Sequence, residues 1–388
     1  MDYKGAFDTG EYRNLLLEYG YPGEEIDRRV EAAYEELFHG PADRTLFHPD
    51  WPDMASFEDT GNSDARTEGM SYAMMMCVQM DRQREFDMLW KFAKTFMWHK
   101  DGKFKGYFAW TTKLDGTRNA DGPAPDGEEY FAMALFFASH RWGDREEPFD
   151  YSAQARAILH ECIHKGEDGG EDLAMWDRSN YLIRFVPGKH ETDASYHLPH
   201  FYELFALWAD EADRSFWKKA AQESRKFLHR ACHPVTGLCP EKGGFDGSPA
   251  EGRRGRYYSD AYRVPAALGL DSLWFNADPW QHDCAGRIQK FFCEREPKQE
   301  YRIYEVDGTV IPEPALHPIA IIATNAEASL ASSLAGGAAG KYARACVELF
   351  WNTPLRTGVR RYYDNCLYFF ALLALSGKYR IWWPKDKS

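Results

Sequence analysis

The chain has 388 residues, of which 44% are hydrophobic and 28% are charged, so it can bury a sizeable core and an intrinsically disordered chain is excluded. The net charge is −13 and no cluster of Lys and Arg stands out. Nucleic acid and anionic membrane surfaces are therefore poor partners, and a neutral or small polar ligand fits better.

The apolar residues recur at helical spacing through most of the chain. This spacing predicts helices over Glu24–Phe38, Gly69–Met80, Glu85–Phe96, Glu128–His140, Ser152–His164, His200–Trp208, Asp213–Ala231, Ala261–Leu270, Pro318–Leu330, Lys341–Trp351 and Asp364–Leu375. Strand patterns are nearly absent, apart from a small hairpin predicted for Gln299–Val306 and Thr309–Ile311. Helix pairs recurring about every sixty residues predict an all-α ring of inner and outer helices, whose long loops form a cleft on one rim.

We expect a single domain over residues 1–388, acting as a monomer, because closed barrels exceed the usual domain length. The first eight residues lack the apolar core of a secretory signal, and no segment has the apolar length of a membrane span. The eight cysteines are scattered along the chain, as reduced core thiols are. These features favour a cytoplasmic protein, unless a signal has been removed.

Two separated acids are the candidates for chemistry. Glu68 lies among an arginine, small residues and a tyrosine at a predicted helix start, where it either acts as an acid or caps the helix. Asp260 is flanked by tyrosines and followed by Arg263, which would hold it ionised and suited to activating water; the alternative is an N-cap of the next helix. Two such separated carboxyl groups are what glycoside hydrolysis needs.

A third carboxyl and several aromatic residues fit a sugar site. Asp126 lies in the stiff run Pro125-Asp126-Gly127, from which it could bind sugar hydroxyls, although this run is also a strong turn signal. The 13 Trp and 22 Tyr exceed what the core needs, and aromatic faces stack on sugar rings. We select Trp110, Tyr196 and Tyr363 as candidate platforms. His197 is a further candidate for contact with backbone or substrate.

A rival signal is His160-Glu161-Cys162-Ile163-His164, which matches the H-E-x-x-H pattern of zinc peptidases on a predicted helix. The third histidine of the extended pattern is absent, because position 170 is Gly, and the next helix offers no clean glutamate ligand. A zinc peptidase is therefore a distant alternative, and neither metal nor cofactor is expected.

Several motifs together resemble glycoside hydrolase family 8, within it the branch that releases xylose from the reducing end of oligosaccharides. They include the segments 66–72, 122–143, 195–203, 316–318 and 361–366. The resemblance implies an (α/α)6 barrel and an inverting mechanism, with Glu68 as general acid, Asp260 as general base and Asp126 holding the distorted sugar. It also implies that the loop at Leu316-His317-Pro318 closes the cleft and that His317 reads the anomeric hydroxyl.

The expected function is therefore the inverting release of xylose from the reducing end of β-1,4-xylo-oligosaccharides of three or more units. Arg263 is added to the expected substrate-binding residues. An endo-acting xylanase, glucanase or chitosanase of the same family is the nearest alternative, and a non-catalytic sugar-binding toroid is another.

Overall fold

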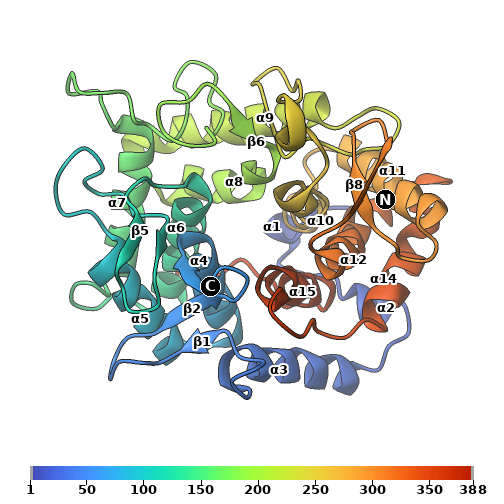
Figure 1. Cartoon of the computed structure of the whole chain (residues 1–388), viewed down its shortest axis with the longest axis horizontal. Helices are drawn as coiled ribbons and strands as arrows, with labels where there is room; N and C mark the ends of the chain where they lie inside the picture. The colour runs from blue at the N-terminus through green and yellow to red at the C-terminus, as the bar shows by residue number, and fades with distance from the viewer. Residues whose placement is uncertain (1–2, 386–388) are drawn as a thin grey trace. The chain divides into compact units, whose positions relative to one another are not determined.

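Helices dominate the computed structural model, which describes residues 3–385 (Figure 1). The longer helices are α3 (Gly23–His39), α4 (Thr67–Met80), α5 (Gln83–Phe92), α6 (Pro125–Trp142), α7 (Tyr151–His164), α8 (Pro199–Trp208), α9 (Arg214–Ala231), α10 (Val264–Trp274), α11 (Trp280–Arg295), α12 (Pro318–Glu327), α14 (Ala343–Trp351) and α15 (Arg361–Leu375). The short ones are α1 (Ala6–Thr9), α2 (Leu15–Glu18) and α13 (Ser329–Ser332). Each of the eleven predicted helices is present among them.

Helix α11 was not predicted, because its buried face mixes polar and small residues with apolar ones. Gln289 on this helix is fully buried and donates hydrogen bonds of 2.8 Å to the Asn325 carbonyl and to the Ser329 hydroxyl. Its side-chain oxygen accepts a 2.7 Å hydrogen bond from Ser332. A buried polar group costs little free energy when its hydrogen bonds are satisfied, and hydropathy periodicity does not detect such a face.

The described chain forms two compact units, each built from separate segments. The first unit contains residues 3–33, 190–200 and 221–380, and the second contains residues 34–189, 201–220 and 381–385. Three of the five boundaries between these segments fall inside helices, in α3, α8 and α9. The expectation of a single domain stays a prediction.

In the second unit, α4 is the central helix. It packs against α5 and α6, and α6 packs in turn against α7. Twelve of the fourteen residues of α4 are buried, so this helix is apolar nearly all round, as a helix enclosed by others must be.

A five-stranded antiparallel sheet completes the second unit. Its strands are β1 (Phe47–His48), β2 (Ser56–Asp59), β3 (Asp64–Arg66), β4 (Thr111–Thr112) and β5 (Arg118–Ala120). The strands have only two to four residues, too short for a period of two to be visible in the sequence. The pairing of Arg66 with Thr111 sets the start of α4 beside Trp110, and the Thr67 amide donates a 3.0 Å hydrogen bond to the Trp110 carbonyl.

In the first unit, α12 packs against α10, α14 and α15, which lie next to one another in Figure 1. A buried ion pair ties α9 to α10, with Arg225 donating 2.9 and 2.7 Å hydrogen bonds to the two oxygens of Asp271. Two small antiparallel sheets belong to this unit, β6 (Thr192–Asp193) with β7 (Lys242–Gly243) and β8 (Arg302–Tyr304) with β9 (Val310–Pro314). The second is the predicted hairpin.

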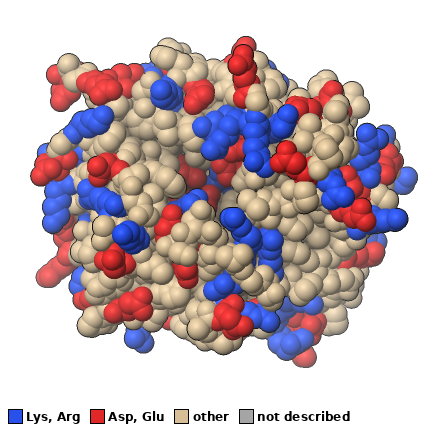
Figure 2. Space-filling model, in the orientation of Figure 1, with Lys and Arg blue, Asp and Glu red and all other residues tan. Residues whose placement is uncertain are grey.

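Residues of both charges are interspersed over the face shown in Figure 2, where Lys and Arg lie beside Asp and Glu. Among the residues that the structure describes, no helix is both long and apolar enough to cross a membrane.

Candidate active site

Glu68 is the second residue of α4 and is partly exposed. Strand β3 leads directly into this helix, so the sheet register fixes where the carboxyl group leaves the backbone. Trp110 is also partly exposed, and the Arg66 guanidinium lies 5.1 Å from the centre of its ring. The second unit therefore brings Glu68 and Trp110 together at the start of α4.

Asp126 is the second residue of α6 and lies at the neighbouring helix start. A Cβ atom added to Gly127 would lie 2.4 Å from the Thr67 Cβ, so the first turns of α4 and α6 are in direct contact. Pro125 is the first residue of α6, a position that suits proline because no amide hydrogen is needed there. The turn alternative for Pro125-Asp126-Gly127 is thus wrong, since the run begins a helix.

Two further acids near the start of α6, Glu128 and Glu129, are buried. The Glu128 carboxylate accepts a 3.1 Å hydrogen bond from the Phe108 amide, and burial raises the pKa of Glu128 well above its ordinary value. The Glu129 carboxylate accepts a 2.9 Å hydrogen bond from the Tyr202 hydroxyl. These contacts fix the helix start that carries Asp126.

Asp260 lies in the 3₁₀ helix Ser259–Arg263 of the first unit, and its side chain is 22% exposed. Arg263 Nη2 is 3.4 Å from Asp260 Oδ1, and the same guanidinium lies 5.4 Å from the centre of the Tyr196 ring. The predicted pairing of Asp260 with Arg263 is therefore present, and Tyr196 joins it. Arg263 and not Asp260 is the N-cap residue of α10, so the capping alternative for Asp260 is wrong.

Asp193 and Glu241 are acids near Asp260 that the sequence did not single out. Burial raises the pKa of Asp193 well above its ordinary value, and the negative charge of Asp260 raises it further. Burial and Asp260 likewise raise the pKa of Glu241 to about 7, although Arg254 pairs with this carboxylate and acts in the opposite direction. One oxygen of each acid is buried with no hydrogen-bond partner.

No sequence signal marks these two acids, because each is an ordinary acid in a loop-like stretch. The β6–β7 pairing sets Asp193 opposite Lys242, the residue after Glu241, and so brings the two segments together. Asp193 also accepts 2.8 and 2.6 Å hydrogen bonds from the amide and hydroxyl of Ser195, one residue before Tyr196.

His317 and Tyr363 form a second group in the first unit. Their rings lie 4.7 Å apart, and the Tyr363 hydroxyl donates a 3.0 Å hydrogen bond to the Ser259 carbonyl, beside Asp260. His317 Nδ1 lies 2.9 Å from Asp364 Oδ2, and the other oxygen of Asp364 accepts a 2.8 Å hydrogen bond from the Ala320 amide. The buried carboxylate thus orients the histidine ring.

His197 occupies an interior position and is completely buried. Its two ring nitrogens lie 2.9 Å from the Thr192 and Ser224 hydroxyls, and the ring stacks on Phe227 at 4.1 Å. Burial lowers the pKa of His197 to about 3, so the ring is neutral. His197 therefore packs in the interior of the protein, where it does not reach a ligand.

The H-E-x-x-H pattern lies on α7, as predicted, but its glutamate faces away from its histidines. Glu161 pairs with Lys165 and packs against Gly106, whereas His160 and His164 both face Asp213. A zinc peptidase needs that glutamate as a general base beside the metal, so this arrangement contradicts the peptidase alternative.

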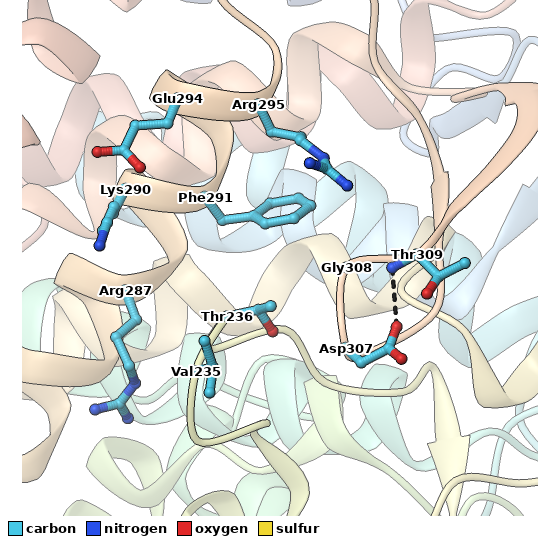
Figure 3. Close-up of a pocket in the computed structure, with 10 residues that line it drawn as sticks. All are labelled: Val235, Thr236, Arg287, Lys290, Phe291, Glu294, Arg295, Asp307, Gly308 and Thr309. Carbon is cyan, nitrogen blue, oxygen red and sulfur yellow. Dashed lines mark hydrogen bonds between the residues drawn. The ribbon is translucent and has the colours of Figure 1, made fainter.

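A separate groove of about 520 Å³ lies in the first unit between α11 and the turn that joins β8 to β9 (Figure 3). The Phe291 ring forms its floor and points toward Gly308, while the Thr309 amide donates a 2.8 Å hydrogen bond to Asp307. None of the predicted site residues lines this groove.

Comparison with known proteins identifies close relatives over the whole chain. The model of the family "Glycosyl hydrolases family 8" matches residues 57–375. The reducing-end xylose-releasing exo-oligoxylanase Rex8A of Paenibacillus barcinonensis is 55% identical over 383 residues, which are 98% of this chain and 99% of that protein. The reducing end xylose-releasing exo-oligoxylanase of Halalkalibacterium halodurans is 54% identical over 386 residues, with 99% and 98% covered.

A solved structure of a reducing end xylose-releasing exo-oligoxylanase matches with a TM-score of 0.95 and 59% identity, covering 98% of this chain and 99% of that one. This likeness confirms the predicted fold class, all-α with the (α/α)6 barrel of the family.

We predict that Gly127→Ala destabilises the protein by about 1–3 kcal/mol, because its methyl group would overlap Thr67 and overpacking costs about this much. In an unconstrained helix the same change would stabilise by about 0.5–1 kcal/mol. The measurement is urea unfolding. Gly122→Ala is the matched control, because nothing lies within 4 Å of the added atom, and equal stability of the two variants would contradict the prediction.

We predict that Glu241→Gln changes the pH dependence of stability. The folded-state pKa of Glu241, about 7, lies above the ordinary value of 4.5. Between pH 4.5 and pH 7 the folded protein retains a proton that the unfolded chain has released. The stability of the wild type therefore falls as the pH rises toward 7. The variant lacks this loss and should gain up to about 3 kcal/mol relative to wild type between pH 4.5 and pH 8.

Urea unfolding across this pH range measures the difference. Glu305→Gln is the matched control, because it removes a carboxylate that is 40% exposed and pairs with Arg256 at 2.8 Å. A pH-independent difference between Glu241→Gln and wild type would show that Glu241 does not titrate as described.

Proposed function

The chain belongs to family 8 of the glycosyl hydrolases, and from this premise we propose that it hydrolyses β-1,4-xylo-oligosaccharides of three or more units, releasing xylose from the reducing end. It is a glycoside hydrolase. The observation that carries the proposal is the identity of more than half of the residues with enzymes named for this activity, over nearly the whole length of both proteins.

Three acids carry the reaction in this proposal. Glu68 protonates the oxygen of the departing xylose, and Asp260 takes a proton from the water that attacks the anomeric carbon. Attack from the opposite face inverts that carbon, so a β-linkage yields an α-configured product. Asp126 holds the hydroxyls of the distorted sugar. The contact of the α4 and α6 starts supports this, since Thr67 and Gly127, the chain neighbours of Glu68 and Asp126, meet there.

Electrostatics around Asp260 support its role as the base. Arg263 Nη2 lies 3.4 Å from Asp260 Oδ1, so a positive charge stands beside the group that accepts the proton. Asp193 and Glu241, whose pKa values are raised, hold their protons more readily than ordinary acids and so limit the charge repulsion on Asp260.

Substrate binding is assigned to the partly exposed Trp110 as an aromatic surface, to Tyr196 and Tyr363, which are 4% and 6% exposed, and to Arg263 as a polar contact. His317 is assigned to the free reducing end. Because Asp364 engages Nδ1, the nitrogen that faces a ligand is Nε2, and in the neutral ring this atom accepts a hydrogen bond. The anomeric hydroxyl can donate that hydrogen, whereas the oxygen of a continuing glycosidic bond has none.

We also propose that the enzyme works in the cytoplasm. The support is the state of its cysteines, which are all free thiols, seven of them buried. Free thiols persist in a reducing compartment. The monomeric state stays a prediction.

We predict that xylotriose labelled at its reducing end yields labelled xylose and unlabelled xylobiose, and that the xylobiose appears first as the α-anomer. Chromatography of the labelled products and proton NMR of the fresh product measure both. Glu68→Gln should lower the rate by at least about 100-fold, because general acid catalysis contributes about 10²–10⁴. Label in xylobiose would indicate another cleavage position, and a β-anomer would contradict inversion.

We predict that His317→Ala relaxes the requirement for a free reducing end. Wild type should cleave xylotriose far faster than its methyl β-glycoside, which lacks the hydrogen of the anomeric hydroxyl. The variant should reduce that preference by at least about 10-fold, as expected when a site that pairs with a substrate hydroxyl is removed. The ratio of kcat/KM for the two substrates measures this. A His229→Ala variant, which alters a surface histidine paired with Asp278, should keep the wild-type ratio, and an unchanged ratio in His317→Ala would overturn the assignment.

A further inference from the structure

Helix α7 presents two histidines to one buried carboxylate in the second unit. His160 Nδ1 lies 3.6 Å from Asp213 Oδ2, and His164 Nε2 lies 2.8 Å from Asp213 Oδ1. The two rings are on the same face of the helix, four residues apart, with centres separated by 4.4 Å. One nitrogen atom of each histidine and one oxygen atom of the aspartate therefore lie close together.

From this geometry we propose that His160, His164 and Asp213 bind a Zn²⁺ ion at a site separate from the glycosidase machinery. The three ligand atoms lie within 4.8 Å of one another. A tetrahedral ion with ligands at about 2.0–2.2 Å needs separations of about 3.4 Å, which small side-chain rotations reach from these positions. Among residues 3–385, no other group of three or more His, Cys or carboxylate side chains converges in this way.

A fourth side chain orients His164 for metal binding. His164 Nδ1 lies 2.7 Å from Glu167 Oε2, while Nε2 points to Asp213. A histidine that ligates a metal through one nitrogen almost always donates the hydrogen of the other to a carboxylate, carbonyl or water, which fixes its tautomer and orientation. Glu167 supplies that acceptor, and Arg178 lies 3.6 Å from its other oxygen.

The difference in exposure between Asp213 and His160 suits an ion that enters from solvent. Asp213 is nearly buried, with 6% of its side chain exposed, whereas His160 is 54% exposed. Water can therefore fill the fourth position of the ion. Two histidines and one carboxylate are a ligand set that suits zinc, and nitrogen ligands disfavour Mg²⁺ and Ca²⁺.

The position of Glu161 decides what the site does. Because this residue pairs with Lys165, no general base stands beside the ion, and the site does not hydrolyse peptides. The ion instead joins the end of α7 to the segment Glu211–Asp213 that precedes α9, so zinc should stabilise the folded chain by mass action.

The test uses the full chain without a histidine tag, freed of metal with a chelator and dialysed. Zinc added to wild type should bind with one ion per chain by calorimetry and by metal analysis after desalting, and it should raise the melting temperature. His160→Ala, which changes an exposed residue, should weaken zinc binding by at least about 100-fold, and Glu167→Gln by about 10–100-fold. Both variants should lose the rise in melting temperature at zinc concentrations that suffice for wild type.

The matched control is His229→Ala, which removes a surface histidine 2.7 Å from Asp278 and should bind zinc like wild type. Co²⁺ in place of zinc should give the visible spectrum of a tetrahedral ion in wild type and not in Asp213→Asn. Wild type without zinc binding, or equal zinc affinity in wild type and His160→Ala, would overturn the proposal. Loss of xylotriose hydrolysis on zinc removal would contradict a separate site, and unchanged hydrolysis by the metal-free enzyme is the expected result.

Discussion

The contact between the first turns of α4 and α6 is the constraint on which the placement of the proposed catalytic acids of the second unit depends. Gly127 meets Thr67 so closely that no side chain fits at position 127, and this contact sets the spacing of the helix starts that carry Glu68 and Asp126. Helix starts carry partial positive charge, which suits acids, and the side chains leave the backbone there in a fixed direction. Rigid elements thus hold groups whose chemistry depends on their position.

The first unit instead holds several acids near one another in a largely buried environment. Burial and the negative charge of Asp260 raise the pKa values of Asp193 and Glu241, while Arg254 pairs with Glu241 and Arg263 with Asp260. Exposure separates the three acids. Asp260 keeps some contact with solvent and an arginine, whereas Asp193 is fully buried and its pKa is raised well above its ordinary value. Burial and charge together divide the acids into one that can act as a base and others that surround it.

Much of the fold was predictable because the helices repeat apolar residues at regular spacing, and the β8–β9 hairpin was predictable from its turn. Helix α11 was not predictable, because buried Gln289 interrupts its apolar spacing. The five short strands were not predictable either, because they are too short to show an alternating pattern. Glu68, Asp126 and Asp260 stood out through their neighbours in the sequence. Asp193 and Glu241 did not, because a β6–β7 pairing between distant segments brings them together, and His197 was misjudged because its burial depends on packing against Phe227.

The α7 motif shows why spacing alone does not define chemistry. A helix with H-E-x-x-H places both histidines on one face, and Asp213 completes a set of three ligands. The glutamate lies one residue further round the helix, so its direction is decided by its neighbours, here Lys165 and the backbone at Gly106. Metal binding needs only the histidine spacing and a third ligand, whereas hydrolysis also needs a base aimed at bound water. The same five residues can therefore bind a metal without catalysing a reaction, and the side chains around them determine which of the two occurs.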